Sequence, residues 1–132
     1  MAFLTQDDLG TITGANSYIT VLECTEYWAD RGIDASDFDD SEIEFSAVKS
    51  TDYIDFRFNG DFIGYKKDAG QSTQFPRTSA FDANGFDVSN TIPENLKKAC
   101  FEYCLRVLND VTLAPDPVYQ DNGQNVKKEK TK

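Results

Sequence analysis

The chain of 132 residues is long enough for one domain with a core of modest size. Its 23 acidic residues against 13 lysines and arginines give a net charge of −10, which argues against a nonspecific nucleic-acid binder because an acidic surface repels a phosphate backbone. The sequence contains no histidine, which excludes the commonest serine and cysteine triads.

The N-terminal part predicts an arm followed by a short helix. Residues 1–13 show no sustained hydrophobic period, as expected of an arm. Thr20 is a typical helix N-cap and Gly32 is a typical residue just beyond a helix end, so we expect a helix over residues 21–31. Its apolar stripe comprises Leu22, Cys24, Tyr27 and Trp28.

A second helix is predicted after an acidic loop over residues 34–40. Ser41 and Glu44 have the spacing of a capping box, with Ser41 as the N-cap. Core-facing positions then recur every three or four residues to about Arg57, and Asn59-Gly60 ends the helix. These positions are Ile43, Ala47, Val48, Thr51, Ile54 and Phe58.

A β-hairpin is predicted next, over about residues 75–90. Pro76 pushes the residue before it out of the helical region, so the chain there is expected to be extended. Residues 78–82 and 86–88 can pair about Asn84-Gly85, the preferred dipeptide of a two-residue type I′ turn. Because a lone hairpin is marginally stable in water, we expect it to pack on the helices or on a neighbouring subunit.

The third predicted helix is the most regular. Thr91 and Glu94 have the spacing of another capping box, and Pro93 suits the first turn. The apolar face continues to about Asp110, and Pro115 lies beyond it. That face comprises Leu96, Ala99, Cys100, Tyr103, Val107 and Leu108.

Together these elements predict a mainly α fold. Residues 1–114 form a small bundle of about three main helices with a β-hairpin arm. Residues 115–132 contain few apolar side chains and end in Lys-Lys-Glu-Lys-Thr-Lys, so we expect a flexible C-terminal tail that is disordered unless a partner binds it.

The sequence gives little support for catalysis or for a bound metal. A calcium loop starting at Asp37 would require glycine at Glu42 and glutamate at Val48. Acidic side chains at a helix N-terminus are also favoured by the helix dipole. The glycines lack the spacing of a P-loop or a dinucleotide-binding motif. We therefore expect no enzyme activity, no cofactor and no metal.

Localisation is predicted from what the sequence lacks. It has no apolar run of about 18 residues and no signal-peptide pattern at its start, so we expect no membrane span and no secretion. Three cysteines are too few for a disulfide scaffold, and we expect reduced thiols in the core.

Several residues are candidates for contacts with subunits or partners. The lysine pairs Lys66-Lys67 and Lys97-Lys98 are scattered rather than interleaved with aromatic residues, unlike a single-strand-binding groove, so solvated surface charge is the favoured interpretation. The segment at Pro76 suits an intersubunit anchor or, alternatively, a loop pinned to its own core. The candidate contacts are Phe75, Pro76, Arg77, Asn84, Gly85, Phe86, Lys97 and Lys98.

Several segments carry a resemblance to a known family. They are Gly14-Ala-Asn-Ser-Tyr-Ile-Thr20, Thr51-Asp-Tyr-Ile-Asp55, Phe75-Pro-Arg-Thr78, and Ile92-Pro93 before Lys97, Lys98 and Ala99. In this order, over residues 14–110, they resemble the head-to-tail connector (adaptor) proteins of tailed bacteriophages. That family is often labelled DnaT-like, after a primosomal single-stranded DNA-binding protein.

The resemblance implies a structural protein of the virion neck, present in the host cytoplasm during assembly. It implies a homo-oligomeric ring, typically of twelve copies, between the portal protein and the tail or a second neck protein. Genomic double-stranded DNA would pass through this ring without specific binding. The tail would dock on the portal through Val118, Tyr119, Lys127, Lys128 and Lys130. The alternative is a DnaT-like replication protein that binds single-stranded DNA in a salt-sensitive way.

Overall fold

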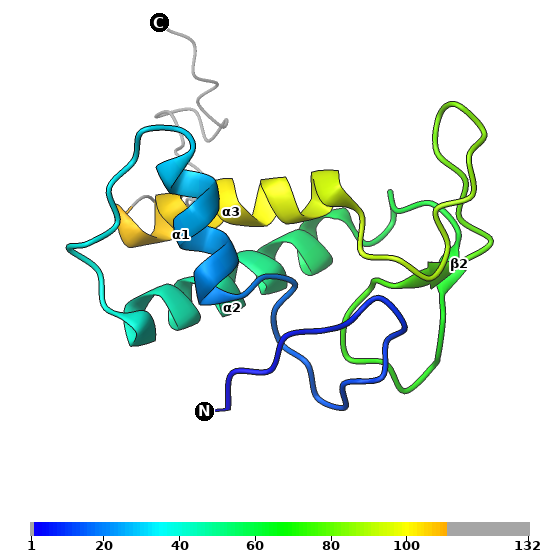
Figure 1. Ribbon diagram of the computed structural model, residues 1–132. Helices are drawn as coiled ribbons and strands as arrows, with labels where there is room; N and C mark the ends of the chain where they lie inside the picture. Colours follow the sequence, from blue (N-terminus) through cyan, green and yellow to red (C-terminus); the bar gives the residue numbers. More distant parts are fainter. Residues whose placement is uncertain (1, 111–132) are drawn as a thin grey trace, which may run out of the picture.

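The computed structural model describes residues 2–110. Over this range the chain forms three helices, and the two longer ones, α2 (Asp40–Phe58) and α3 (Glu94–Leu108), pack along each other. The short helix α1 (Val21–Ala29) crosses this pair. The N-terminal segment and residues 59–92 gather at one end of the molecule, and the loop between α1 and α2 lies at the other end (Figure 1). The predicted mainly α fold with a small hairpin is confirmed, while the predicted tail lies outside the described residues.

Helix α1 begins at the predicted cap. The Thr20 hydroxyl accepts a hydrogen bond from the Glu23 backbone N–H (3.1 Å), and the Glu23 carboxylate accepts one from the Thr20 backbone N–H (2.9 Å). The helix ends at Ala29, two residues earlier than predicted. Leu22 was expected on the apolar stripe but is exposed, because the helical period places it away from the buried Trp28.

Helix α2 uses a different cap from the predicted one. Asp39 is the N-cap, and its carboxylate accepts a hydrogen bond from the Glu42 backbone N–H (2.8 Å) while Glu42 reciprocates (3.0 Å). The sequence offers two capping boxes offset by two residues, Asp39 with Glu42 and Ser41 with Glu44. The first forms, so the helix begins at Asp40.

Helix α3 begins without the predicted capping box. Pro93 is the N-cap and makes no side-chain capping hydrogen bond, so the expected pairing of Thr91 with Glu94 is wrong. Pro93 has extended backbone angles (φ −60°, ψ 144°), and regular helix therefore starts only at Glu94.

The core lies where the three helices meet. Trp28 of α1, Ile43 and Ile54 of α2, and Phe101 of α3 are buried there. The Trp28 indole N–H donates to the Phe101 carbonyl oxygen (3.2 Å), so the only tryptophan also ties α1 to α3. The cysteines Cys24, Cys100 and Cys104 are free and buried.

Residues 59–92, between α2 and α3, form a projecting region (Figure 1). From here on we call this region the arm, and the name does not include residues 1–13. Its sheet pairs β1 (Tyr65–Lys66) with β2 (Arg77–Thr78) in antiparallel register, a pairing that was not predicted. Beyond β2 the chain forms a second hairpin closed by an isolated bridge between Phe81 and Asp87.

The hairpin at Asn84-Gly85 is confirmed, but the predicted type I′ turn is wrong. The Gly85 backbone N–H donates to the Asp82 carbonyl oxygen (2.9 Å), so Ala83 and Asn84 are the central residues of the turn. Only Gly85 has a positive φ (+84°), whereas a type I′ turn requires two such residues. The Asp82 carboxylate fixes the turn by accepting hydrogen bonds from the backbone N–H groups of Asn84 (2.9 Å) and Phe86 (3.0 Å).

Candidate nucleic-acid interface

The segment Phe75-Pro76-Arg77 is buried in the protein's own core. Arg77 is 7% exposed, and its guanidinium donates to the carbonyl oxygens of Ile63 (2.6 Å) and Gly64 (3.0 Å) and to the side-chain oxygen of Gln74 (3.0 Å). These bonds fix the start of β1 against the segment before β2. The structure therefore matches the loop pinned to its own core, and it leaves little of these three side chains exposed for a partner.

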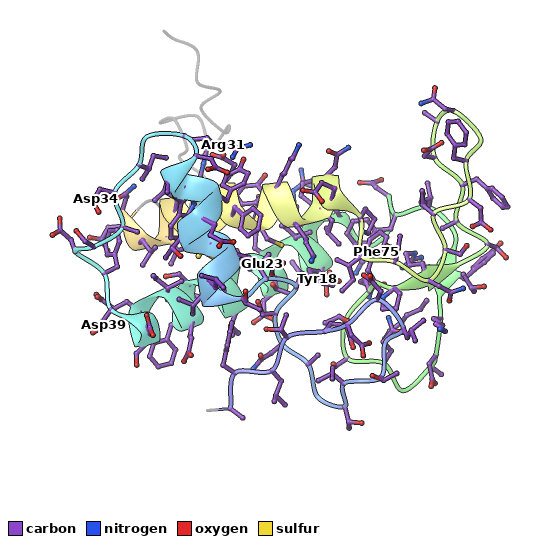
Figure 2. The ribbon with its side chains drawn as sticks, in the orientation of Figure 1. Tyr18, Glu23, Arg31, Asp34, Asp39 and Phe75 are labelled. Carbon is purple, nitrogen blue, oxygen red and sulfur yellow. The ribbon has the colours of Figure 1, made fainter. Side chains whose placement is uncertain are left out.

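A buried polar contact joins the arm to the helices. The Tyr18 hydroxyl donates to the Asp55 carboxylate (2.6 Å) and accepts from the Phe75 backbone N–H (3.1 Å). The Gln74 backbone N–H donates to the other Asp55 oxygen (3.2 Å). Tyr18 and Phe75 lie together at this junction (Figure 2). Three of the segments that carry the resemblance thus meet at the base of the arm.

Burial governs ionisation at this junction. It raises the pKa of Tyr18 far above its ordinary value, and the adjacent Asp55 carboxylate adds to this effect. Burial also raises the pKa of Asp55, although the hydrogen bonds from Tyr18 and Gln74 act in the opposite direction. Burial therefore keeps the Tyr18 hydroxyl protonated and able to donate its hydrogen bond to Asp55.

The outer surface of the arm carries three exposed aromatic rings. Tyr65 is 71% exposed, Phe81 55% and Phe86 68%. Lys66 follows Tyr65 but is half-buried on the opposite face of β1, whereas Lys67, two residues after Tyr65, is exposed. Exposed rings beside cations are the elements of surfaces that stack unpaired bases and hold the phosphates between them.

A groove of about 560 Å³ separates the arm from the start of α3. Its apolar lining includes Ile63 and Val88 of the arm and Ile92 and Pro93 before the helix. Asp8, Asp82 and Glu94 also line the groove, and Asp8 accepts a hydrogen bond from the Ile92 backbone N–H (3.0 Å), so the groove does not favour a phosphate group.

Charge is distributed unevenly along the molecule. Residues 30–44 contain seven acidic residues and one arginine, whereas the arm contains four acidic residues and three cations. Asp34 and Asp39 lie at one end of the molecule, on the far side of α1 from Phe75 (Figure 2). The excess negative charge is thus concentrated away from the exposed rings.

The remaining candidate contacts are dispersed. Lys97 forms an ion pair with Glu23 of α1 (3.2 Å), so this lysine is paired with a carboxylate of its own chain. Lys98 is exposed on α3, and Asn84 and Gly85 are exposed at the hairpin turn beside Phe86. The tail candidates, Val118, Tyr119, Lys127, Lys128 and Lys130, lie outside the described residues.

Sequence reasoning missed Tyr65 and Phe81 as surface residues, because β-prone aromatic side chains usually indicate burial. The adjacent Lys66-Lys67 was the available signal that β1 lies at the surface. Within residues 2–110, the structure contains no helix long and apolar enough to cross a membrane and brings together no cluster of side chains suited to a metal ion.

Comparison of the sequence with known protein families finds a match to one family model. A family model described as "Putative DnaT-like ssDNA binding protein" matches residues 1–132. No curated protein and no solved structure matches the chain. The family description names single-stranded DNA binding, so the prediction of a connector protein of the virion neck is wrong. The match favours the alternative, against which the net charge had argued.

Proposed function

We propose that this chain, which belongs to the family of DnaT-like single-stranded DNA-binding proteins, binds single-stranded DNA through the exposed rings of its arm. The observation that carries the proposal is the presence of Tyr65, Phe81 and Phe86 on the surface of the arm, which has far less excess negative charge than residues 30–44. The hydrogen bonds of Tyr18 with Asp55 and Phe75 hold the arm on α2, and those of the buried Arg77 hold the two strands of the arm together.

Base stacking supplies most of the affinity in this proposal. Each base stacked on an aromatic side chain contributes about 1–3 kcal/mol, so three rings could contribute about 3–9 kcal/mol before the cost of ordering the strand. Such binding tolerates any sequence, because every base has an aromatic face. It also discriminates against duplex DNA, whose bases are already stacked on each other.

Phosphate contacts make a smaller contribution. Lys66 and Lys67 are the cations of the arm that remain after Arg77 is used internally. Two phosphate contacts predict a slope of about −1.4 in a plot of log affinity against log salt for single strands. A shallow slope reconciles single-strand binding with a net charge of −10.

The test compares matched phenylalanine variants. Phe81→Ala should weaken binding of a fluorescent oligothymidylate about tenfold, as measured by fluorescence anisotropy at low salt, because about 1.4 kcal/mol of stacking is lost. The control is Phe45→Ala on α2, since Phe45 has the same exposure of 55% and lies at the acidic end.

Equal losses for the two variants, or undetectable binding by the unaltered protein, would contradict the proposal. Duplex DNA of the same length provides a second reference. It should bind more weakly than the single strand at every salt concentration.

A further inference from the structure

A second hollow lies at the acidic end of the molecule. It is a pocket of about 630 Å³ between α1, the loop after it and the start of α2. Its apolar lining comprises Ala29, Ile33, Ala35, Phe38 and Ile43. Hydrogen bonds from the backbone N–H of Ile33 to the Trp28 carbonyl oxygen (2.9 Å) and from Phe38 to Ala35 (3.1 Å) hold the loop that forms its wall.

The rim of this pocket is acidic. Asp34 and Asp40 line it, and the exposed Asp37 and Asp39 lie beside them in the chain. The one cation of residues 30–44, Arg31, is directed to α1: its guanidinium lies 3.5 Å from the centre of the Tyr27 ring and donates to the Tyr27 carbonyl oxygen (3.1 Å). Arg31 therefore does not neutralise the carboxylates of the rim. A pocket with an apolar floor and an acidic rim is suited to bind a peptide segment in which an apolar side chain lies next to lysines or arginines.

This chain contains such a segment outside the described residues. Val126 directly precedes Lys127 and Lys128, and Lys130 follows. Residues 115–132 have four lysines against three acidic residues, unlike the strongly acidic remainder of the chain.

The described chain ends close to the pocket. The Cys104 thiol of α3 lies 3.8 Å from the carbonyl oxygen of Ile43, which lines the pocket, and α3 ends one turn later at Leu108. In Figure 1 the C-terminal end of α3 and the loop after α1 lie at the same end of the molecule. Fifteen residues lie between Asp110 and Val126, a reach of up to roughly 50 Å when extended.

We propose that residues 126–130 dock in this pocket of the same chain, with Val126 on the apolar floor and the lysines on the acidic rim. Tethering supplies an effective concentration in the millimolar range, so weak intrinsic affinity suffices for substantial occupancy. The docking site lies at the opposite end from the arm and does not depend on DNA binding there.

A nitroxide label on the full-length chain tests the docking. Because the three natural cysteines are buried, a Thr131→Cys variant can be labelled selectively at its new thiol. The label should broaden the amide NMR signals of Ile33, Ala35 and Phe38 and leave those of Gly85 and Phe86 unchanged. Because the Debye length falls to about 3 Å at 1 M salt, the broadening should diminish strongly there.

Paired charge variants provide the control. Asp34→Asn with Asp40→Asn should abolish the broadening, whereas Asp61→Asn with Asp68→Asn in the arm should preserve it. Both pairs remove the same charge, and each includes one carboxylate that accepts a hydrogen bond from the backbone two residues later, at Ser36 (2.9 Å) or Gly70 (3.1 Å).

Three outcomes would overturn the proposal. The first is no broadening around the pocket, and the second is broadening that survives removal of the rim charges. The third is seen in a mixture of an isotope-labelled copy without nitroxide and a nitroxide-labelled copy without isotope. Broadening of the amide signals of the isotope-labelled copy, lost when the mixture is diluted, would mean that the tail docks on a neighbouring molecule.

Discussion

Removing one hydroxyl from the junction beneath the arm should destabilise the protein substantially. The ring of Tyr18 is completely buried, so Tyr18→Phe preserves its packing and deletes only the oxygen that bonds to Asp55 (2.6 Å) and to the Phe75 backbone N–H (3.1 Å). Loss of a hydrogen bond to a charged group costs about 1.5–3 kcal/mol, and a buried N–H left without an acceptor costs about 1–3 kcal/mol.

Asp55 is only half-buried, which allows water to replace part of the lost bond. We therefore expect the free energy of unfolding to fall by about 2–4 kcal/mol, which moves the urea midpoint by roughly 1–3 M. Urea unfolding can be followed through Trp28, because this single tryptophan is fully buried in the folded chain.

The matched control is Tyr53→Phe, which removes a hydroxyl from a half-buried ring of α2 and should change stability by less than about 0.5 kcal/mol. A loss below about 0.5 kcal/mol for Tyr18→Phe would refute the reasoning, since it would mean that the junction does not fix the arm.

Two further predictions concern pH and backbone conformation. Burial raises the pKa of Asp55, so the folded state holds this proton more tightly than the unfolded chain and the stability contributed by Asp55 falls as pH rises from about 3.9 through the raised pKa. Asp55→Asn should lack this fall, and a stability difference from the unaltered protein that does not change with pH would contradict the assignment. Gly64→Ala should destabilise by more than about 3 kcal/mol in urea unfolding, because its Cβ would lie 2.4 Å from the Thr78 carbonyl oxygen at φ +69°. Gly85→Ala should cost about 1 kcal/mol, since φ is +84° there but nothing lies within 4 Å, and equal losses for the two glycines would argue against the close approach at β2.

The helices could be predicted from local sequence because their signals are local. Thr20 caps α1 as predicted, since its partner Glu23 is three residues away. The predicted start of α2 lies two residues after the observed one, because Asp39 and Ser41 each begin a capping-box pattern and only the Asp39 box forms. At α3, the spacing of Thr91 matched a capping box, but the extended backbone of Pro93 starts the helix later.

The arm could be predicted only in part because its contacts are not local. Tyr65 pairs with Thr78 across the connection 67–76, and the turn at Asp68–Gln71 within it does not by itself set the register of the two strands. Arginine is rarely buried, so nothing in the sequence indicated that Arg77 would satisfy carbonyl oxygens from Ile63 and Gly64. Phe86 was among the candidate contacts, but Tyr65 and Phe81 were missed because their exposure depends on which neighbouring side chains this burial leaves outside.

The internal use of Arg77 also decides how the arm can interact with other molecules. An exposed arginine would have added a third phosphate contact, but its guanidinium is committed to backbone carbonyls beneath the sheet. What remains outside is Tyr65, Phe81 and Phe86, two lysines and the four acidic residues of the arm, so this surface offers exposed rings but no excess of positive charge. Such a surface favours ligands with unstacked aromatic rings over ligands with closely spaced negative charges. For nucleic acids this preference selects unpaired strands, because duplex DNA presents its phosphates and hides its bases.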